Sequence, residues 1–160
     1  MGNLKLGFKI IIPALVITFS LTSCNEIIRV MDILGMIPPS EQKLELQLEK
    51  QAIGEPFSFA DYCKEEYDSI FLVYPYFNIE KEDFVNLKMS DKLRGICESN
   101  ACSDSFSTLL FINNGIVKAY SIMATANADF NAREVEKHYI FPIEQKFIMD
   151  KERNIHIYNE

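Results

Sequence analysis

The chain has 160 residues, of which 48% are hydrophobic and 24% charged, and its formal net charge is −7 at pH 7. This length is enough for one domain with a buried core, so a single domain is expected. The acidic excess disfavours binding to nucleic acid or to an anionic lipid surface through bulk charge.

Residues 1–23 have the pattern of a secretory signal peptide. Lys5 and Lys9 precede an apolar run from Ile10 to Leu21, and the segment contains no acidic residue. A run of about a dozen residues is short for a membrane-spanning helix, which needs roughly 20. The segment therefore predicts export and cleavage rather than a permanent transmembrane helix.

The apolar run ends in Leu21-Thr22-Ser23-Cys24, which resembles the lipobox of bacterial lipoproteins. The resemblance implies that the nucleophilic thiolate of Cys24 receives a diacylglycerol, that the signal is cut before it, and that the new amino group is acylated. Such a lipid anchor would hold the protein on the membrane of the cell envelope. Asn25 stands where inner-membrane retention signals have Asp, which implies the outer membrane in a Gram-negative cell. An ordinary secretory signal with an incidental cysteine is the alternative.

Three segments are expected along the chain. They are the signal peptide over residues 1–23, a lipidated tether with a short helix over 24–39, and a globular domain over 40–160. Removing the signal takes away two lysines and no acidic residue, so the net charge of the mature chain becomes −9. The tether is apolar, unlike a flexible Gly/Ser linker, and Pro38-Pro39 ends any helix within it.

The globular domain begins with an ambiguous segment after Lys43. Leu44, Leu46 and Leu48 alternate with polar residues, and a period of two favours a strand with one exposed face. A helix starting from Ser40 is the alternative, because Glu, Gln, Lys and Leu are all good helix formers. The strand is the favoured prediction.

The middle of the domain mixes one strong strand with short helices. Ser58 is a suitable N-cap for a short helix, and Ile70–Tyr74 is a compact run of strand-forming residues that Pro75 ends. This run is expected to be a central strand that is buried on both faces. Helices are expected from the acidic stretch Glu80–Asp83 and after a cap at Ser90.

The most specific local signal is Asn113-Asn114-Gly115, which joins the runs Ser107–Ile112 and Ile116–Tyr120. Asn-Gly supplies the positive φ angles of a tight turn, so the segment predicts an antiparallel hairpin. Further strands are expected over residues 138–141, 146–149 and 155–158. Together these elements predict an α+β fold, with a largely antiparallel sheet and two or three short helices.

Three cysteines remain beside Cys24, and an exported protein can form disulfides. Cys97 and Cys102 enclose four residues, so a local disulfide between them is possible. Cys63 could instead pair with either of them, or it could stay reduced as a small buried side chain.

No residue pattern predicts catalysis. His138 and His156, taken with the cysteines, match no usual zinc-ligand spacing, so no metal site is expected. Nucleophile, phosphate-loop and dinucleotide motifs are absent, and no cofactor is expected. The acidic clusters at residues 65–68 and 80–83 lack the ligand spacing of a calcium loop and indicate solvated faces.

Aromatic residues concentrate around the central strand, and most of them are expected in the core. Tyr76 and Phe77, which follow Pro75, are the candidates for an exposed recognition surface. The order of residues 67–76, of the hairpin 109–117 and of Ala128-Asp129-Phe130 resembles a group of small uncharacterised bacterial envelope lipoproteins. The resemblance covers roughly residues 44–149 and implies neither a catalytic residue nor a specific partner.

These observations favour a membrane-anchored envelope lipoprotein with a non-catalytic domain. The expected role is a binding, accessory or inhibitory module for an unidentified protein or envelope component, with no nucleic acid partner. An envelope hydrolase whose site is assembled only by folding is one alternative. A structural component of a surface assembly is the other.

Overall fold

The computed structural model describes residues 43–63, 66–130 and 132–159. The expected signal peptide, the tether and Cys24 all lie outside these ranges. Within them the chain forms eight strands in two four-stranded sheets, together with short helices, so the predicted α+β fold is confirmed. No helix in the described ranges has the length and apolarity needed to cross a membrane.

The first sheet, sheet A, is antiparallel throughout. Its strands, in spatial order, are β4 (Ile116–Ala124), β3 (Phe106–Asn113), β2 (Ser69–Val73) and β6 (Ile140–Pro142). The second sheet, sheet B, consists in spatial order of β1 (Phe57–Ser58), β7 (Lys146–Met149), β8 (Asn154–Ile157) and β5 (Asp129–Phe130). In sheet B, β1 pairs with β7 and β7 with β8 in antiparallel orientation, whereas β5 and β8 are parallel.

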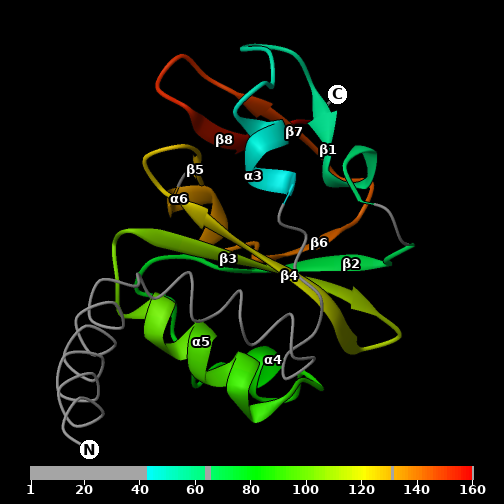
Figure 1. Ribbon diagram of the computed structural model, residues 1–160, viewed down its shortest axis with the longest axis vertical. Helices are drawn as coiled ribbons and strands as arrows, with labels where there is room; N and C mark the ends of the chain where they lie inside the picture. The colour runs from blue at the N-terminus through cyan, green and yellow to red at the C-terminus, as the bar shows by residue number, and fades with distance from the viewer. Residues whose placement is uncertain (1–42, 64–65, 131, 160) are drawn as a thin grey trace, which may run out of the picture. The chain divides into compact units, whose positions relative to one another are not determined.

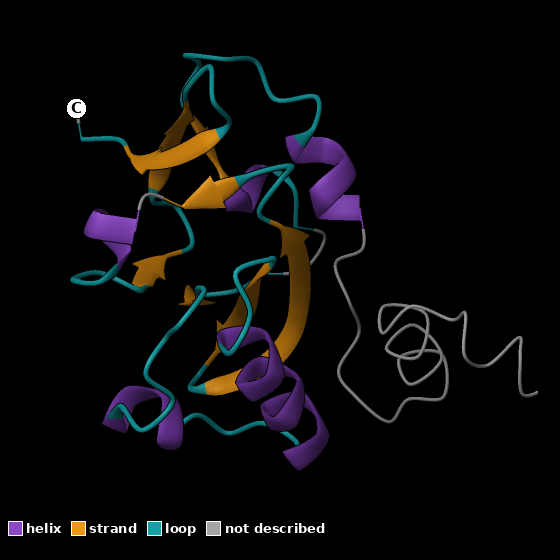
Figure 2. Ribbon diagram, turned by 90° about the vertical axis from the view of Figure 1, so that its left-hand side faces the viewer, coloured by secondary structure: helices purple, strands orange, loops and turns teal. Residues whose placement is uncertain are grey.

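Sheet A is the middle layer of the domain (Figure 1). The helices α4 (Glu82–Val85) and α5 (Asp91–Ala101) cover one of its faces. Sheet B and the helix α3 (Lys43–Leu48) lie on the other face, and α6 (Ala132–Val135) lies at their side. The perpendicular view in Figure 2 again places the longest helix on the side of sheet A away from sheet B.

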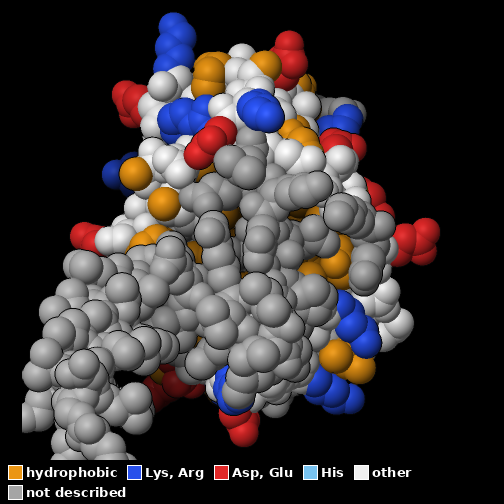
Figure 3. Space-filling view, in the orientation of Figure 1, with side chains coloured by type: hydrophobic (Ala, Val, Ile, Leu, Met, Phe, Trp, Pro, Cys, Tyr) orange, Lys and Arg blue, Asp and Glu red, His pale blue; other side chains and the backbone are white. Residues whose placement is uncertain are grey.

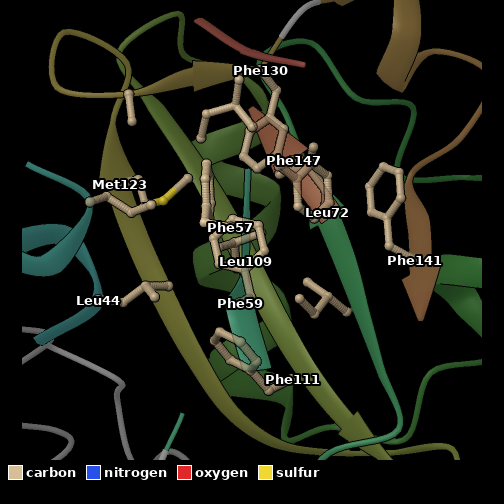
Figure 4. Packing of buried hydrophobic residues seen from close by; sticks show 14 of the residues in the cluster. Leu44, Phe57, Phe59, Leu72, Leu109, Phe111, Met123, Phe130, Phe141 and Phe147 are labelled. Carbon is tan, nitrogen blue, oxygen red and sulfur yellow. The ribbon is translucent and has the colours of Figure 1, made fainter. Parts of the chain in front are cut away.

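Strand β2 is buried on both faces, as predicted. Ile70 and Leu72 belong to the hydrophobic cluster between the two sheets, which Figure 4 shows from close by. Phe71 points the other way, and its ring packs against Phe77 at 5.6 Å and Phe84 at 5.9 Å between centroids. Alternate residues of one strand therefore join two separate apolar layers.

The predicted hairpin is also confirmed. Asn114 and Gly115 have φ angles of 52° and 73° and connect β3 to β4. Asp68 stabilises the turn, because its Oδ2 atom accepts a hydrogen bond of 2.6 Å from the backbone N–H of Asn114. A hydrogen bond from the Ser69 hydroxyl, and after it the bond from Asn114, lower the pKa of the Asp68 carboxyl.

The prediction of a strand after Lys43 is wrong, because residues Lys43–Leu48 form the helix α3. Leu44 and Leu48 are four residues apart, so they lie on one face of a helix, and each is 1% exposed. Two of the leucines that suggested a period of two thus also satisfy the helical period. The helix-forming residues between them decide the outcome.

The remaining expected elements lie close to their predicted places. Ser58 caps the 3-10 helix η1 (Phe59–Asp61), and its hydroxyl accepts a hydrogen bond from the N–H of Ala60. The hydroxyl of Ser90 accepts one from the N–H of Leu93 at the start of α5. The three C-terminal strands appear as β6, β7 and β8.

Candidate functional site

A tight turn follows strand β2 and presents Tyr76 to solvent. The N–H of Phe77 donates a 3.0 Å hydrogen bond to the carbonyl of Tyr74, with Pro75 and Tyr76 at the two central positions. Tyr76 has a φ angle of 61°. Proline in the first central position and a positive φ in the second are the features of a type II turn, which normally has glycine at the second.

The backbone of Tyr76 is fixed, whereas its side chain is free of the core. Its N–H donates a 2.7 Å hydrogen bond to the carbonyl of Ala101, at the C-terminal end of α5. The Tyr76 side chain is 74% exposed. Recognition by this residue stays a prediction, but the geometry required for it is present.

The prediction that Phe77 belongs to an exposed recognition surface is wrong, because its side chain is only 4% exposed. Its ring packs edge-on against Tyr74 and Tyr139, each at 5.3 Å between centroids. It turns inward because the turn directs successive side chains to opposite sides. The buried ring of Phe77 thus packs on the inner side of the turn, and Tyr76 is the exposed aromatic residue of the turn.

A charged residue covers the edge of this aromatic layer. The Nζ atom of Lys81 lies 4.0 Å from the ring centroid of Tyr139 and 5.2 Å from that of Phe77. The Tyr139 hydroxyl donates a 2.8 Å hydrogen bond to Asp83, and this bond is the main reason that the pKa of Tyr139 is raised. These contacts hold the segment before β6 against α4.

The two histidines occupy different environments. His156, on β8, lies between two carboxylates: its Nδ1 atom is 3.1 Å from Glu134 and its Nε2 atom 3.0 Å from Asp150. Hydrogen bonds to Asp150 and then to Glu134 raise the pKa of His156. His138 is exposed and lines an open cavity beside α6.

This cluster has the geometry of an ion pair rather than of a catalytic base. Carboxylate oxygens only accept, so both ring nitrogens of His156 carry protons when both hydrogen bonds are made. A ring in that state has no lone pair with which to take a proton from a nucleophile. Because the carboxylates lie on opposite sides of the ring, the three groups do not converge on one point. Among the described residues, no group of three or more His, Cys, Asp or Glu side chains could hold a metal ion.

The two cysteines of the possible disulfide are separate in the structure. Cys97 is fully buried on the inner face of α5, while Cys102 is exposed at the C-terminal end of that helix. Both thiols are free, so the disulfide is not formed here. Burial raises the pKa of the Cys97 thiol to about 12. Cys63 is half-buried and packs against the core.

The sequence did not indicate the contact of His156 with Glu134 and Asp150. Glu134 is 22 residues from His156 along the chain, and only the packing of α6 beside β8 brings them together. The strands expected over residues 146–149 and 155–158 were a partial signal, because the short connection between them returns the chain so that His156 lies near Asp150.

No protein-family model matches the chain, and no curated protein or solved structure matches it either.

Proposed function

We propose that the protein is a lipid-anchored envelope lipoprotein whose domain is a non-catalytic binding or accessory module, with Tyr76 as the central contact for its partner. The observation that carries this proposal is the exposed aromatic ring on a backbone with a positive φ. The partner is another protein or a component of the envelope.

The fold itself has little reason to place tyrosine in this turn. A residue other than glycine in the left-handed region costs roughly 1–2 kcal/mol. With 74% of its surface exposed, the Tyr76 side chain recovers little of that cost by burial. A large aromatic side chain at a strained and exposed position is therefore better explained by a contact outside the domain.

The turn is also suited to binding because it is already ordered. The hydrogen bond from Tyr76 to Ala101 and the buried ring of Phe77 fix the backbone on both sides of the exposed ring. Little conformational entropy remains to be lost when a partner covers the ring. Tyrosine is enriched among the residues that dominate binding energies.

Partner capture tests the role of Tyr76. The full chain is purified with cross-linking from detergent-solubilised envelopes, as wild type, as Tyr76→Gly and as Val85→Ala. Val85 is a matched control because it is apolar and 55% exposed on α4. We expect Tyr76→Gly to recover at least about tenfold less of the partner that wild type and Val85→Ala recover, the loss typical of one hot-spot residue. Equal recovery by all three would refute the role of Tyr76.

The lipid anchor rests on the resemblance of Leu21-Thr22-Ser23-Cys24 to a lipobox. Incorporation of labelled fatty acid into wild type and Cys24→Ala tests it directly. We expect label in wild type only, together with loss of signal cleavage by the lipoprotein peptidase in the variant. Equal labelling of both proteins would contradict the anchor.

The two alternatives gain less support. The hydrolase requires a histidine that can act as a base, and both ring nitrogens of His156 face carboxylates. The structural assembly requires a long, regular edge strand. β4 is an edge strand of sheet A, but its pairing with β3 is interrupted by an extra residue, Lys118, between the partners of Phe111 and Ile112. A bulge with an exposed lysine is a feature that discourages edge-to-edge pairing.

A further inference from the structure

The turn between β3 and β4 contains Asn114-Gly115, a dipeptide in which the asparagine can lose its side-chain amide. In this reaction, deamidation, the backbone nitrogen of Gly115 attacks the side-chain carbonyl carbon of Asn114. A C–N bond forms, and ammonia leaves with the proton of the attacking nitrogen. Water then opens the resulting succinimide ring at either carbonyl and gives aspartate or isoaspartate. Glycine favours the attack because it has no side chain to obstruct the approach.

Water and hydroxide reach this turn without obstruction. Asn114 and Gly115 are both exposed, and a Cβ atom added at Gly115 would meet no heavy atom within 4 Å beyond its chain neighbours. Figure 3 shows Lys and Arg side chains interspersed with Asp and Glu on the described part of one face, without a single-sign field there. The conformation of the turn therefore decides how fast the reaction runs.

The closed turn holds the two reacting groups apart. Asn114 and Gly115 have φ angles of 52° and 73°, and positive values at both central residues are the feature of a type I′ turn. The first central residue of such a turn has a ψ of about +30°, so the Cβ of Asn114 and the nitrogen of Gly115 lie on nearly opposite sides of the Cα–C bond. Closing a five-membered ring requires them on the same side. The hairpin must therefore open before the attack.

Asp68 keeps the turn closed. Its Oδ2 atom accepts the 2.6 Å hydrogen bond from the N–H of Asn114, while its Oδ1 atom accepts one of 2.7 Å from the hydroxyl of Ser69. The side-chain amide of Asn114 also donates a 2.6 Å hydrogen bond to the side chain of Asn113. A hydrogen bond to a carboxylate is stronger than one between neutral groups. Opening the turn breaks the bond to Asp68, so this bond slows the reaction.

We propose that Asn114 is a deamidation site that the closed hairpin protects, with Asp68 as the residue that sets the degree of protection. Isoaspartate would add one carbon atom to the backbone of a two-residue turn, which no longer fits the register of the flanking strands. Either product would also place a second carboxylate near that of Asp68. The modified hairpin thus pairs less stably. This site is independent of the role proposed for Tyr76.

Incubation of the full chain at mildly alkaline pH in a non-ionic detergent tests the proposal. Peptide mass mapping measures the conversion of Asn114 with time, and a synthetic peptide of residues 111–118 gives the rate without the fold. We expect Asn114 to react at least about tenfold more slowly in the folded chain than in the peptide, because a local opening costs free energy. Equal rates in the chain and the peptide would overturn the proposal.

Two variants test the role of Asp68. Asp68→Ala removes the acceptor for the N–H of Asn114, whereas Ser69→Ala removes a donor to Asp68 and keeps that acceptor. We expect Asp68→Ala to raise the rate in the folded chain about fivefold, the effect of losing one hydrogen bond, and Ser69→Ala to leave it nearly unchanged. Hydrogen exchange of β7, in sheet B, is the control for global unfolding and should stay as in wild type. Equal rates in the two variants, a rate that rises only with a loss of protection in β7, or an intact Asn114 in Asp68→Ala would overturn the proposal.

Discussion

The Nε2 atom of His156 lies 3.0 Å from the Oδ2 atom of Asp150, and the opposite nitrogen of the same ring faces Glu134. The imidazole thereby connects three places in the chain: the turn after β7, strand β8 and the helix α6. Asp150 is further held by hydrogen bonds from the backbone and side chain of Asn154. A protonated ring completes this network, so its charge state affects the stability of the domain.

We expect the domain to lose stability as the pH rises above neutrality. The two carboxylates raise the pKa of His156 above its ordinary value of 6.5. A histidine with a raised pKa in the folded state stabilises the fold fully below its unfolded-state pKa, and it loses that contribution as the pH rises through the folded-state value. The pKa of Asp150 is lowered, mainly by His156, so its own contribution is lost only in acid. Thermal unfolding of the full chain between about pH 6 and pH 8.5 measures the effect, because this range spans the titration of a histidine with a raised pKa.

Two variants distinguish this network from general charge effects. His156→Gln removes the titrating ring and is expected to lower the melting temperature by a few degrees at about pH 6, where His156 is charged, with a smaller difference at about pH 8.5. His138→Gln removes an exposed histidine outside the network and is expected to keep the wild-type pH dependence. If the melting temperature of His156→Gln depends on pH as strongly as that of wild type, the network does not cause this dependence.

We expect Arg153 to hold the C-terminal end of α3 against the rest of the domain through hydrogen bonds. Its guanidinium donates 2.8 Å hydrogen bonds to the carbonyls of Leu48, at the end of α3, and of Asn127. Arg153→Lys keeps the charge but loses the planar fork, so it should lower the free energy of unfolding by about 1–2 kcal/mol. Denaturant unfolding measures the cost. Hydrogen exchange should show the largest loss of protection over residues 43–50.

The neighbouring Lys151 provides the control, because it is exposed in the same turn. Lys151→Gln should change neither stability nor exchange. An even loss of protection across all strands in Arg153→Lys would mean that the arginine acts on the whole domain rather than on α3.

The sequence predicted best where a short segment alone determines its structure. Asn114-Gly115 requires positive φ angles, and Ser58 and Ser90 are caps whose hydroxyls accept backbone hydrogen bonds nearby. The prediction for Lys43–Leu48 was wrong because six residues with three leucines fit both a strand and a helix. Packing of Leu44 and Leu48 in the core decided between them, and that packing involves residues far away in the chain.

The candidate site was predictable only in part for the same reason. The position of Tyr76 after a proline indicated a turn, but nothing local distinguished its orientation from that of Phe77. The pocket for the Phe77 ring is formed by Phe71, Phe84 and Tyr139, which belong to three other elements or linking segments. The cavity beside α6 requires the C-terminal strand to be in place before its lining residues meet.

The contrast between Phe77 and Tyr76 gives a third prediction. Phe77→Ala removes a buried ring from the layer between sheet A and α4, so it should lower the free energy of unfolding by about 3–5 kcal/mol. Tyr76→Gly removes an exposed ring and relieves a positive φ, so it should leave stability unchanged or raise it by up to about 1 kcal/mol. Denaturant unfolding of both full-length variants checks the pair. A large loss in Tyr76→Gly would mean that the ring supports the fold, and it would weaken the proposed recognition role.

The cysteines of α5 should differ sharply in reactivity. Burial raises the pKa of the Cys97 thiol to about 12, so almost none of it is the reactive thiolate near neutral pH, and the side chain is fully buried. Cys102 is exposed. Maleimide treatment of the folded, unreduced chain, followed by peptide mass mapping, should therefore label Cys102 and leave Cys97 unmodified until denaturant is added. Cys102→Ser should remove the native label of the α5 peptide without changing stability. If neither residue reacts in denaturant until a reductant is added, the two are joined by the disulfide that the structure lacks, and α5 must rearrange at its C-terminal end to form it.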